Sequence, residues 1–140
     1  MHLDLTDEQR AVREMARKFA DEYSIPVARD NDVHERFDCI VLDPPAFVKS
    51  RSKVREGLQG YWEINRRAMR LVKPGGYLIT CSCSYHVDPD TFRATLVRAA
   101  RAARRSVTLL EMRSQARDHP VFLPLSESAY LKCAVLMFID

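Results

Sequence analysis

The apolar positions of this chain follow two spacings, one typical of helices and one typical of strands. Over Leu5–Tyr23 they recur every three or four residues, which predicts an amphipathic helix. Thr6 and Gln9 have the spacing of a capping box at its start, and Pro26 follows its end. We therefore expect an N-terminal helix that is followed by a polar joint at residues 31–36.

A continuous apolar run begins near Phe37 and ends abruptly in an acid and two prolines. The Ile40–Leu42 run is typical of a strand buried on both faces of a parallel sheet. Pro44 and Pro45 have no N–H for the strand ladder, so the strand should stop near Asp43. Asp43 is therefore expected at the carboxyl edge, where open α/β sheets bind ligands.

Two helices and three strands are predicted after this turn. A basic loop at Val48–Glu56 comes first. In chain order the elements are then a helix at Gly57–Val72, a strand at Tyr77–Thr80, a helix capped by Asp88, and strands at Val107–Glu111 and Tyr130–Ile139. The first strand, helix and strand form a right-handed βαβ unit, so their strands should be parallel and end at one edge. The last two strands have no helix between them and should pair antiparallel. The fold class is therefore α/β, in the order β-α-β-α-β-β after the N-terminal helix.

Two stretches of the predicted fold are basic. One is the Val48–Glu56 loop, which is either solvated or a lid that contacts phosphate. The other is the outer side of the helix after Asp88, which is either solvated or in contact with RNA. Its basic residues are Arg93, Arg98, Arg101, Arg104 and Arg105.

Composition narrows the class of protein further. The chain has 140 residues, 46% hydrophobic content and a formal charge of +3, which allows one modest domain and neither demands nor excludes a nucleic-acid partner. Four cysteines form no C-x-x-C pair and no metal-ligand spacing with the histidines, so we expect no metal site and no disulfide framework. No signal pattern or membrane-spanning run is present, and we expect a cytoplasmic protein.

Six short motifs occur in a fixed order between Phe37 and Asp140. They are DPPAF at 43–47, G-Y-x-x-I-N at 60–65, P-G-G at 74–76, S-C-S at 82–84, Q-A-x-D-H-P at 115–120 and Y-L-K at 130–132. In this order they resemble the C-terminal half of class I S-adenosylmethionine (SAM)-dependent methyltransferases. The resemblance is closest to the RNA cytosine-C5 methyltransferases of the large-subunit ribosomal RNA type. It implies a partial Rossmann-like sheet and an RNA substrate.

The chemistry of that family requires a cysteine. Carbon 5 of cytosine is a poor nucleophile until a thiolate adds to carbon 6. By resemblance Cys83 is this nucleophile, and Asp43 is the acid that stabilises the ring nitrogen. Cys81 is expected to be a packed, unreactive thiol, and Cys39 and Cys133, which lie within apolar strands, are expected in the core.

The same resemblance assigns the cofactor and the substrate contacts. Asp43, Pro44 and Pro45 would line the methyl-proximal side of a SAM site, while Phe47, Lys49 and Arg51 would contact RNA. All four glycines follow DPPAF, so the glycine-rich cofactor loop is missing and we expect weak or no SAM binding.

Two features leave the chemistry open. Many RNA cytosine methyltransferases carry a second cysteine after the prolines, where this chain has Ala46, so product release would need another base. Methyltransferases that act on amino groups instead place an aromatic residue directly after the prolines, and Phe47 stands one residue later.

The N-terminal segment points to another family. Residues 3–32 are similar to the opening helix of acyl-CoA dehydrogenases, which divides the chain into a helical segment at 1–32 and a methyltransferase half at 33–140. Three functions are therefore open: an incomplete catalytic half, a non-catalytic fragment or interaction module, and an acyl-CoA dehydrogenase-related fragment. The unpaired sheet edge could also allow self-association.

Overall fold

The computed structural model describes residues 7–19, 21–22 and 36–140. The chain divides into two units, Met1–Arg36 and Phe37–Asp140, and each is described by itself. In the first, α1 covers Asp7–Phe19 and exposes Val12 and Met15. This confirms the predicted N-terminal helix over that range. Its predicted ends, the capping residue Thr6 and most of the polar joint lie outside the described residues.

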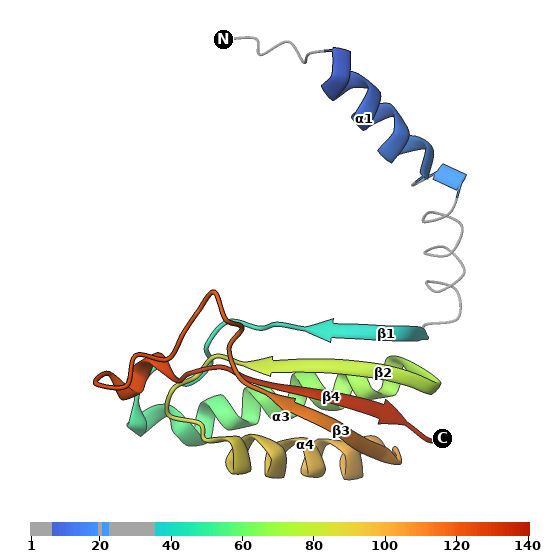
Figure 1. The fold of residues 1–140 in the computed structure, drawn as a ribbon. Helices are drawn as coiled ribbons and strands as arrows, with labels where there is room; N and C mark the ends of the chain where they lie inside the picture. Colours follow the sequence, from blue (N-terminus) through green and yellow to red (C-terminus); the bar gives the residue numbers. More distant parts are fainter. Residues whose placement is uncertain (1–6, 20, 23–35) are drawn as a thin grey trace. The chain divides into compact units, whose positions relative to one another are not determined.

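The second unit is a four-stranded sheet with both of its α-helices on one face (Figure 1). The strands are β1 (Phe37–Leu42), β2 (Val72–Ser82), β3 (Val107–Arg113) and β4 (Lys132–Phe138), in the spatial order β1-β2-β4-β3. The helices are α3 (Val54–Leu71) and α4 (Pro89–Ala103). As predicted, β1 and β2 are parallel and β3 and β4 are antiparallel.

The core lies between the helices and the sheet. Tyr61 and Met69 of α3 and Phe92 of α4 are fully buried, as are Leu78 of β2 and Phe138 of β4. The rings of Tyr61 and Phe92 meet edge to face with centroids 5.8 Å apart, which is a favourable aromatic geometry. The core therefore joins the two helices to each other as well as to the sheet.

Helix α3 begins earlier than the apolar pattern predicts. A 3-10 turn, η2, covers Arg51–Lys53, and α3 follows from Val54, so the prediction that Val48–Glu56 is a loop is wrong for its second half. The first turn carries an ion pair of 2.7 Å between Lys53 and Glu56. Such i,i+3 pairs favour a helix without any apolar periodicity, which explains why the sequence pattern missed it.

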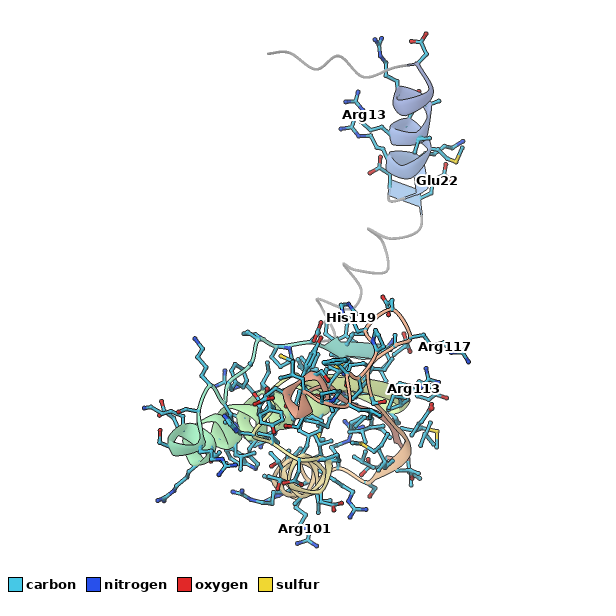
Figure 2. The ribbon with its side chains drawn as sticks, turned by 60° about the vertical axis from the view of Figure 1, so that its left-hand side comes forward. Arg13, Glu22, Arg101, Arg113, Arg117 and His119 are labelled. Atoms are coloured by element: carbon cyan, nitrogen blue, oxygen red, sulfur yellow. The ribbon has the colours of Figure 1, made fainter. Side chains whose placement is uncertain are left out.

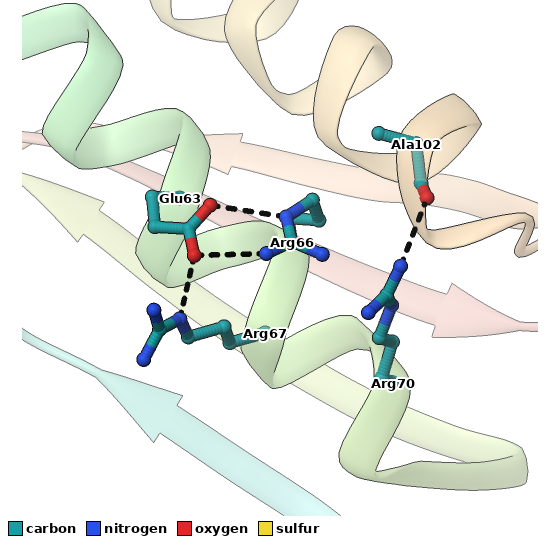
Figure 3. Close-up of polar contacts among 5 residues, drawn as sticks. All are labelled: Glu63, Arg66, Arg67, Arg70 and Ala102. Carbon is teal, nitrogen blue, oxygen red and sulfur yellow. Dashed lines mark hydrogen bonds and ion pairs between the residues drawn. The ribbon is translucent and has the colours of Figure 1, made fainter.

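The exposed side of α3 is held by a second charged cluster (Figure 3). The carboxylate of Glu63 accepts hydrogen bonds from Arg66 at 2.8 Å and from Arg67 at 2.6 Å. These two arginines lower the pKa of Glu63 to about 2. Arg70 donates to the carbonyl oxygen of Ala102 at 3.4 Å and so links α3 to the end of α4.

Strand β1 is not buried on both faces. Ile40 and Leu42 pack against the core, but Cys39 is exposed and Val41 is 64% exposed. The predictions of a doubly buried strand and of a core Cys39 are therefore wrong. The reason is that α3 and α4 cover the same face of the sheet and, among the described residues, no helix of this unit covers the other (Figure 1).

Arg105 does not belong to the basic outer side of α4. Its guanidinium donates to the carbonyl oxygens of Met69 at 2.8 Å and Val72 at 2.7 Å, and to the Asp140 carboxylate at 3.1 Å. It also lies 4.7 Å from the ring centroid of Phe138. The sequence-based assignment of Arg105 to a solvated face is wrong, because it satisfies carbonyl groups where α3 gives way to β2.

A testable consequence concerns Gly57, which lies under the turn that follows β1. A Cβ atom there would collide with the Val48 side chain and come within 2.8 Å of the Phe47 carbonyl oxygen. We expect Gly57→Ala to lower the free energy of unfolding by about 1–2 kcal/mol, because overpacking outweighs the gain in helix propensity. Urea denaturation followed by circular dichroism measures this. Gln59→Ala, at an exposed position of the same helix, is the control; a stabilised Gly57→Ala variant would contradict the packing.

Candidate active site

The carboxyl ends of β1 and β2 meet at one edge of the sheet, as the βαβ unit predicts. Leu42 pairs with Thr80, so Asp43 follows the end of β1 close to where β2 ends at Ser82. Cys83 is half-buried, and its thiol donates to the Pro44 carbonyl oxygen at 3.8 Å. The structure therefore brings Cys83 against the D-P-P turn that carries the exposed Asp43.

The next residue, Ser84, holds this edge together. Its buried hydroxyl accepts a hydrogen bond from the Val48 N–H at 3.1 Å and shares another with the Tyr61 hydroxyl at 2.8 Å. Its carbonyl oxygen accepts from Val87 N at 3.0 Å. One residue thus ties the turn after β1 to α3 and to the segment after β2. Buried polar groups are costly when unpaired, so this network restricts where Cys83 can lie.

Lys132 completes the network from β4. Lys132 is only 5% exposed, and its ammonium group donates to the carbonyl oxygens of Ser84 at 2.6 Å and Tyr130 at 2.7 Å. Burial lowers the pKa of Lys132 to about 8, while the nearby acidic groups of Cys83 and Asp88 act in the opposite direction. The sequence analysis gave no role to Lys132, although a lysine inside the apolar β4 is a signal that could have found it.

Cys81 lies earlier in β2 and faces a different environment. It pairs across the sheet with Cys133 of β4. Burial, together with the neighbouring Cys133 thiol and the Asp43 carboxylate, raises the pKa of Cys81 to about 12. At neutral pH Cys81 therefore stays a thiol, and a thiol is a weak nucleophile. Cys133 itself is half-buried within β4.

The predicted substrate contacts follow the same turn. Phe47 is half-buried, with its ring centroid 4.8 Å from that of Tyr61, so it braces the turn against α3. Lys49 and Arg51 follow the buried Val48 in the chain, and both are exposed. Contact of these three residues with RNA stays a prediction.

The residues predicted to line a SAM site lie together in the turn after β1. Asp43 and Pro45 are exposed at the edge and Pro44 is buried beside Cys83, so this turn can line one side of a cofactor. The four glycines lie elsewhere: Gly57 and Gly60 are in α3 beside Phe47, and Gly75, with a φ of 74°, and Gly76 are in β2. Weak or absent SAM binding by this chain stays a prediction.

The described part of the chain has neither a metal-binding cluster nor a membrane-spanning helix. Within it, no group of three or more histidine, cysteine, aspartate or glutamate residues could hold a metal ion. No helix in residues 7–19, 21–22 or 36–140 is long and apolar enough to cross a membrane.

Known proteins share the sequence of this chain over most of its length. No protein-family model matches the chain. Over 104 residues it is 43% identical to the ribosomal RNA large subunit methyltransferase I of Erwinia tasmaniensis, covering 74% of this chain and 26% of that protein. Over 101 residues it is 44% identical to the protein of the same name from Citrobacter koseri, covering 72% of this chain and 26% of that protein.

This chain is similar to part of a ribosomal RNA large subunit methyltransferase. It spans about a quarter of the length of these curated relatives. These matches confirm the predicted resemblance to an rRNA methyltransferase. The cytosine-C5 type and the acyl-CoA dehydrogenase resemblance of residues 3–32 stay predictions.

Solved structures confirm the fold. A Streptococcus mutans protein described as a SAM-dependent methyltransferase matches with a TM-score of 0.58 and 22% identity, covering 78% of this chain and 27% of that one. A methyltransferase structure complexed with S-adenosylhomocysteine (SAH) matches with a TM-score of 0.61 and 18% identity, covering 96% of this chain and 37% of that one. The mixed sheet is thus that of the SAM-dependent methyltransferases, present in part.

The different surroundings of the cysteines can be tested by alkylation. Because the pKa of Cys81 is raised to about 12, its thiolate fraction at pH 8 is about one in ten thousand. We expect iodoacetamide at pH 8 to modify the exposed Cys39 while Cys81 stays unmodified, as measured by peptide mass spectrometry. The urea-denatured chain, in which all four cysteines should react, is the control. Equal labelling of Cys39 and Cys81 in the folded chain would refute this environment for Cys81.

Proposed function

We propose that residues 37–140 are the catalytic half of a SAM-dependent methyltransferase that modifies carbon 5 of cytosine in ribosomal RNA. The observation that carries the proposal is the contact between Cys83 and the D-P-P turn, at the edge where parallel strands end. The names of the relatives support the rRNA substrate. A cytoplasmic location would follow from that substrate and belongs to the same proposal.

Each group at the edge has a role in this reaction. The Cys83 thiolate adds to carbon 6 of cytosine, which makes carbon 5 nucleophilic. Asp43 donates a proton or a hydrogen bond to ring nitrogen 3, where negative charge would otherwise develop. Ser84 and Lys132 hold the backbone next to Cys83. Cys81, which is protonated at neutral pH, takes no part.

Substrate contacts are proposed along the turn that leads from Asp43 into η2. Lys49 and Arg51 are exposed cations that suit phosphate, and the exposed side of Phe47 suits a base. The alternative, methylation of an amino group, needs no cysteine beside the prolines. The position of Cys83 against Pro44 therefore favours the cytosine reaction.

By itself the chain is proposed to be incomplete. All four glycines lie within α3 and β2, so the glycine-rich part of the cofactor site would come from elsewhere, either from a longer polypeptide or from a second one. A non-catalytic fragment is the second candidate function, and the same observation favours it. Within the described residues β1 pairs only with β2, so its other edge could bind a partner strand or a second copy of this chain.

A chimera tests the nucleophile. We would replace the matching quarter of the Erwinia tasmaniensis enzyme with residues 37–140 of this chain and supply RNA that carries 5-fluorocytosine. Covalent trapping is expected, because fluorine at carbon 5 cannot leave as a proton does. A denaturing gel detects the protein–RNA adduct.

Two variants of the chimera give the control. Cys83→Ala should abolish the adduct, and Cys81→Ala should keep it. The reverse result would assign the nucleophile to Cys81, and an adduct in both variants would exclude this chemistry for either residue.

The isolated chain should bind SAM weakly or not at all. Class I methyltransferases hold the cofactor with a glycine-rich loop and with an acid at the end of their second strand, and neither is assigned in this chain. These groups would supply two or three charge-assisted hydrogen bonds, each worth about 1.5–3 kcal/mol, so their loss weakens binding by several orders of magnitude. Isothermal titration of the purified chain with SAM measures this, and the chimera is the positive control. Saturable micromolar binding by the isolated chain would show that the site is complete without a second half.

A further inference from the structure

We propose that a basic groove between the start of α3 and the middle of α4 binds the phosphate backbone of RNA. The inference rests on the proposed RNA substrate and adds a binding surface beyond the active-site edge. Sequence analysis treated the loop after DPPAF and the outer side of α4 as separate basic stretches. The structure joins them in one groove.

The groove is lined from two elements that are far apart in the sequence. Arg51 of η2 and Arg55 of α3 form one side, and Arg98 of α4 reaches it from the neighbouring helix. Ser52 and Gln59 add a hydroxyl and an amide that can donate hydrogen bonds. Three guanidinium groups and two neutral donors therefore converge on one hollow.

The charges of these arginines are not neutralised within the described part of the chain. The side chains of Arg51, Arg55 and Arg98 have no hydrogen bond or ion pair there. The neighbouring Glu56 is already paired with Lys53 at 2.7 Å, and on α4 Arg93 is paired with Asp90 at 3.0 Å. A helix surface that is merely solvated gains from such pairs, so three unpaired arginines around one groove favour an anionic ligand.

The type of side chain favours phosphate. A guanidinium presents a planar fork of donors that fits two phosphate oxygens at once, and clustered arginines can contact successive phosphates of one strand. Carboxylates of an acidic protein could also bind such a fork. The rRNA named in the relatives makes RNA the better supported ligand.

The groove is also held at a defined position relative to the active-site edge. The Val48 N–H donates to the Oγ of Ser84 at 3.1 Å, and Ser84 directly follows Cys83 in the chain. Val48 itself is buried, with 2% of its surface exposed. Arg51 follows this anchor by three residues. An RNA strand with its backbone in the groove would therefore be held close to the turn that carries Asp43.

The test compares two triple variants of the full chain in binding a short fluorescein-labelled single-stranded RNA, measured by fluorescence anisotropy. The groove variant replaces Arg51, Arg55 and Arg98 by glutamine. The control variant replaces Arg101, Arg104 and Arg117 by glutamine, and these three exposed arginines lie outside the groove. Figure 2 shows Arg101 on the outer side of α4. Both variants remove three positive charges, so a difference between them cannot come from net charge.

We expect the groove variant to bind RNA about tenfold or more weakly than the control. The slope of log Kd against log salt concentration should also fall by about 2, because each single-strand phosphate contact contributes about 0.7. Circular dichroism checks that both variants fold, and the single variants Arg55→Gln and Arg98→Gln should each show part of the loss.

Three results would overturn the proposal. They are equal RNA affinities for the groove and control variants, no RNA binding by the wild-type chain, and displacement of RNA by polyglutamate at equal charge concentration, which would identify a site for an acidic protein. The methyltransferase proposal is tested separately by 5-fluorocytosine trapping in the chimera, so the failure of one can be distinguished from the failure of the other.

Discussion

The arrangement of this edge of the sheet depends on the buried hydrogen bonds of one serine. Ser84 connects the turn after β1 through Val48, helix α3 through Tyr61, and strand β4 through Lys132. These partners are 36, 23 and 48 residues away in the chain. Removing the Ser84 hydroxyl would take away the hydrogen-bond partner of the buried Val48 N–H, and an unpaired buried polar group costs more than the net gain from forming the bond. The active-site edge and the core are therefore stabilised by the same contacts.

The elements with strong apolar periodicity could be predicted from the sequence, and so could the site residues that topology alone brings together. The right-handed βαβ unit was enough to place Asp43 and Cys83 at one edge. Burial of β1 could not be predicted in the same way. Its continuous apolar run is typical of a strand covered on both faces, but in this unit the helices lie on one face, which leaves Val41 exposed. Such a run is suited to a sheet that is covered on both faces, and the matching segment makes up about a quarter of the length of the relatives.

Side chains whose partners are distant in sequence escaped prediction for a different reason. The sequence pattern places Arg105 on a basic helix face, but in the structure it binds carbonyl groups 33 and 36 residues away. Lys132 likewise donates to a carbonyl 48 residues away. The sequence does not indicate which distant carbonyl a basic residue will bind, although a lysine inside an apolar strand is a signal that it has a buried partner. The basic groove is a related case, because neither the η2 stretch nor α4 indicates that Arg98 lies beside Arg51 and Arg55.

Close approaches between backbone segments account for three of the four glycines. Gly57 and Gly60 allow the turn after β1 to approach α3, and Gly76 allows β2 to approach the backbone at Asp38. Each close approach stabilises the unit formed by residues 37–140, so this unit can bury its core without a cofactor. Gly75, with a positive φ of 74°, lies in β2, so all four glycines of the chain stand within elements of this unit. A polypeptide that completed the proposed enzyme would therefore add the cofactor site to an edge that is already organised, with Cys83 held in place before the cofactor arrives.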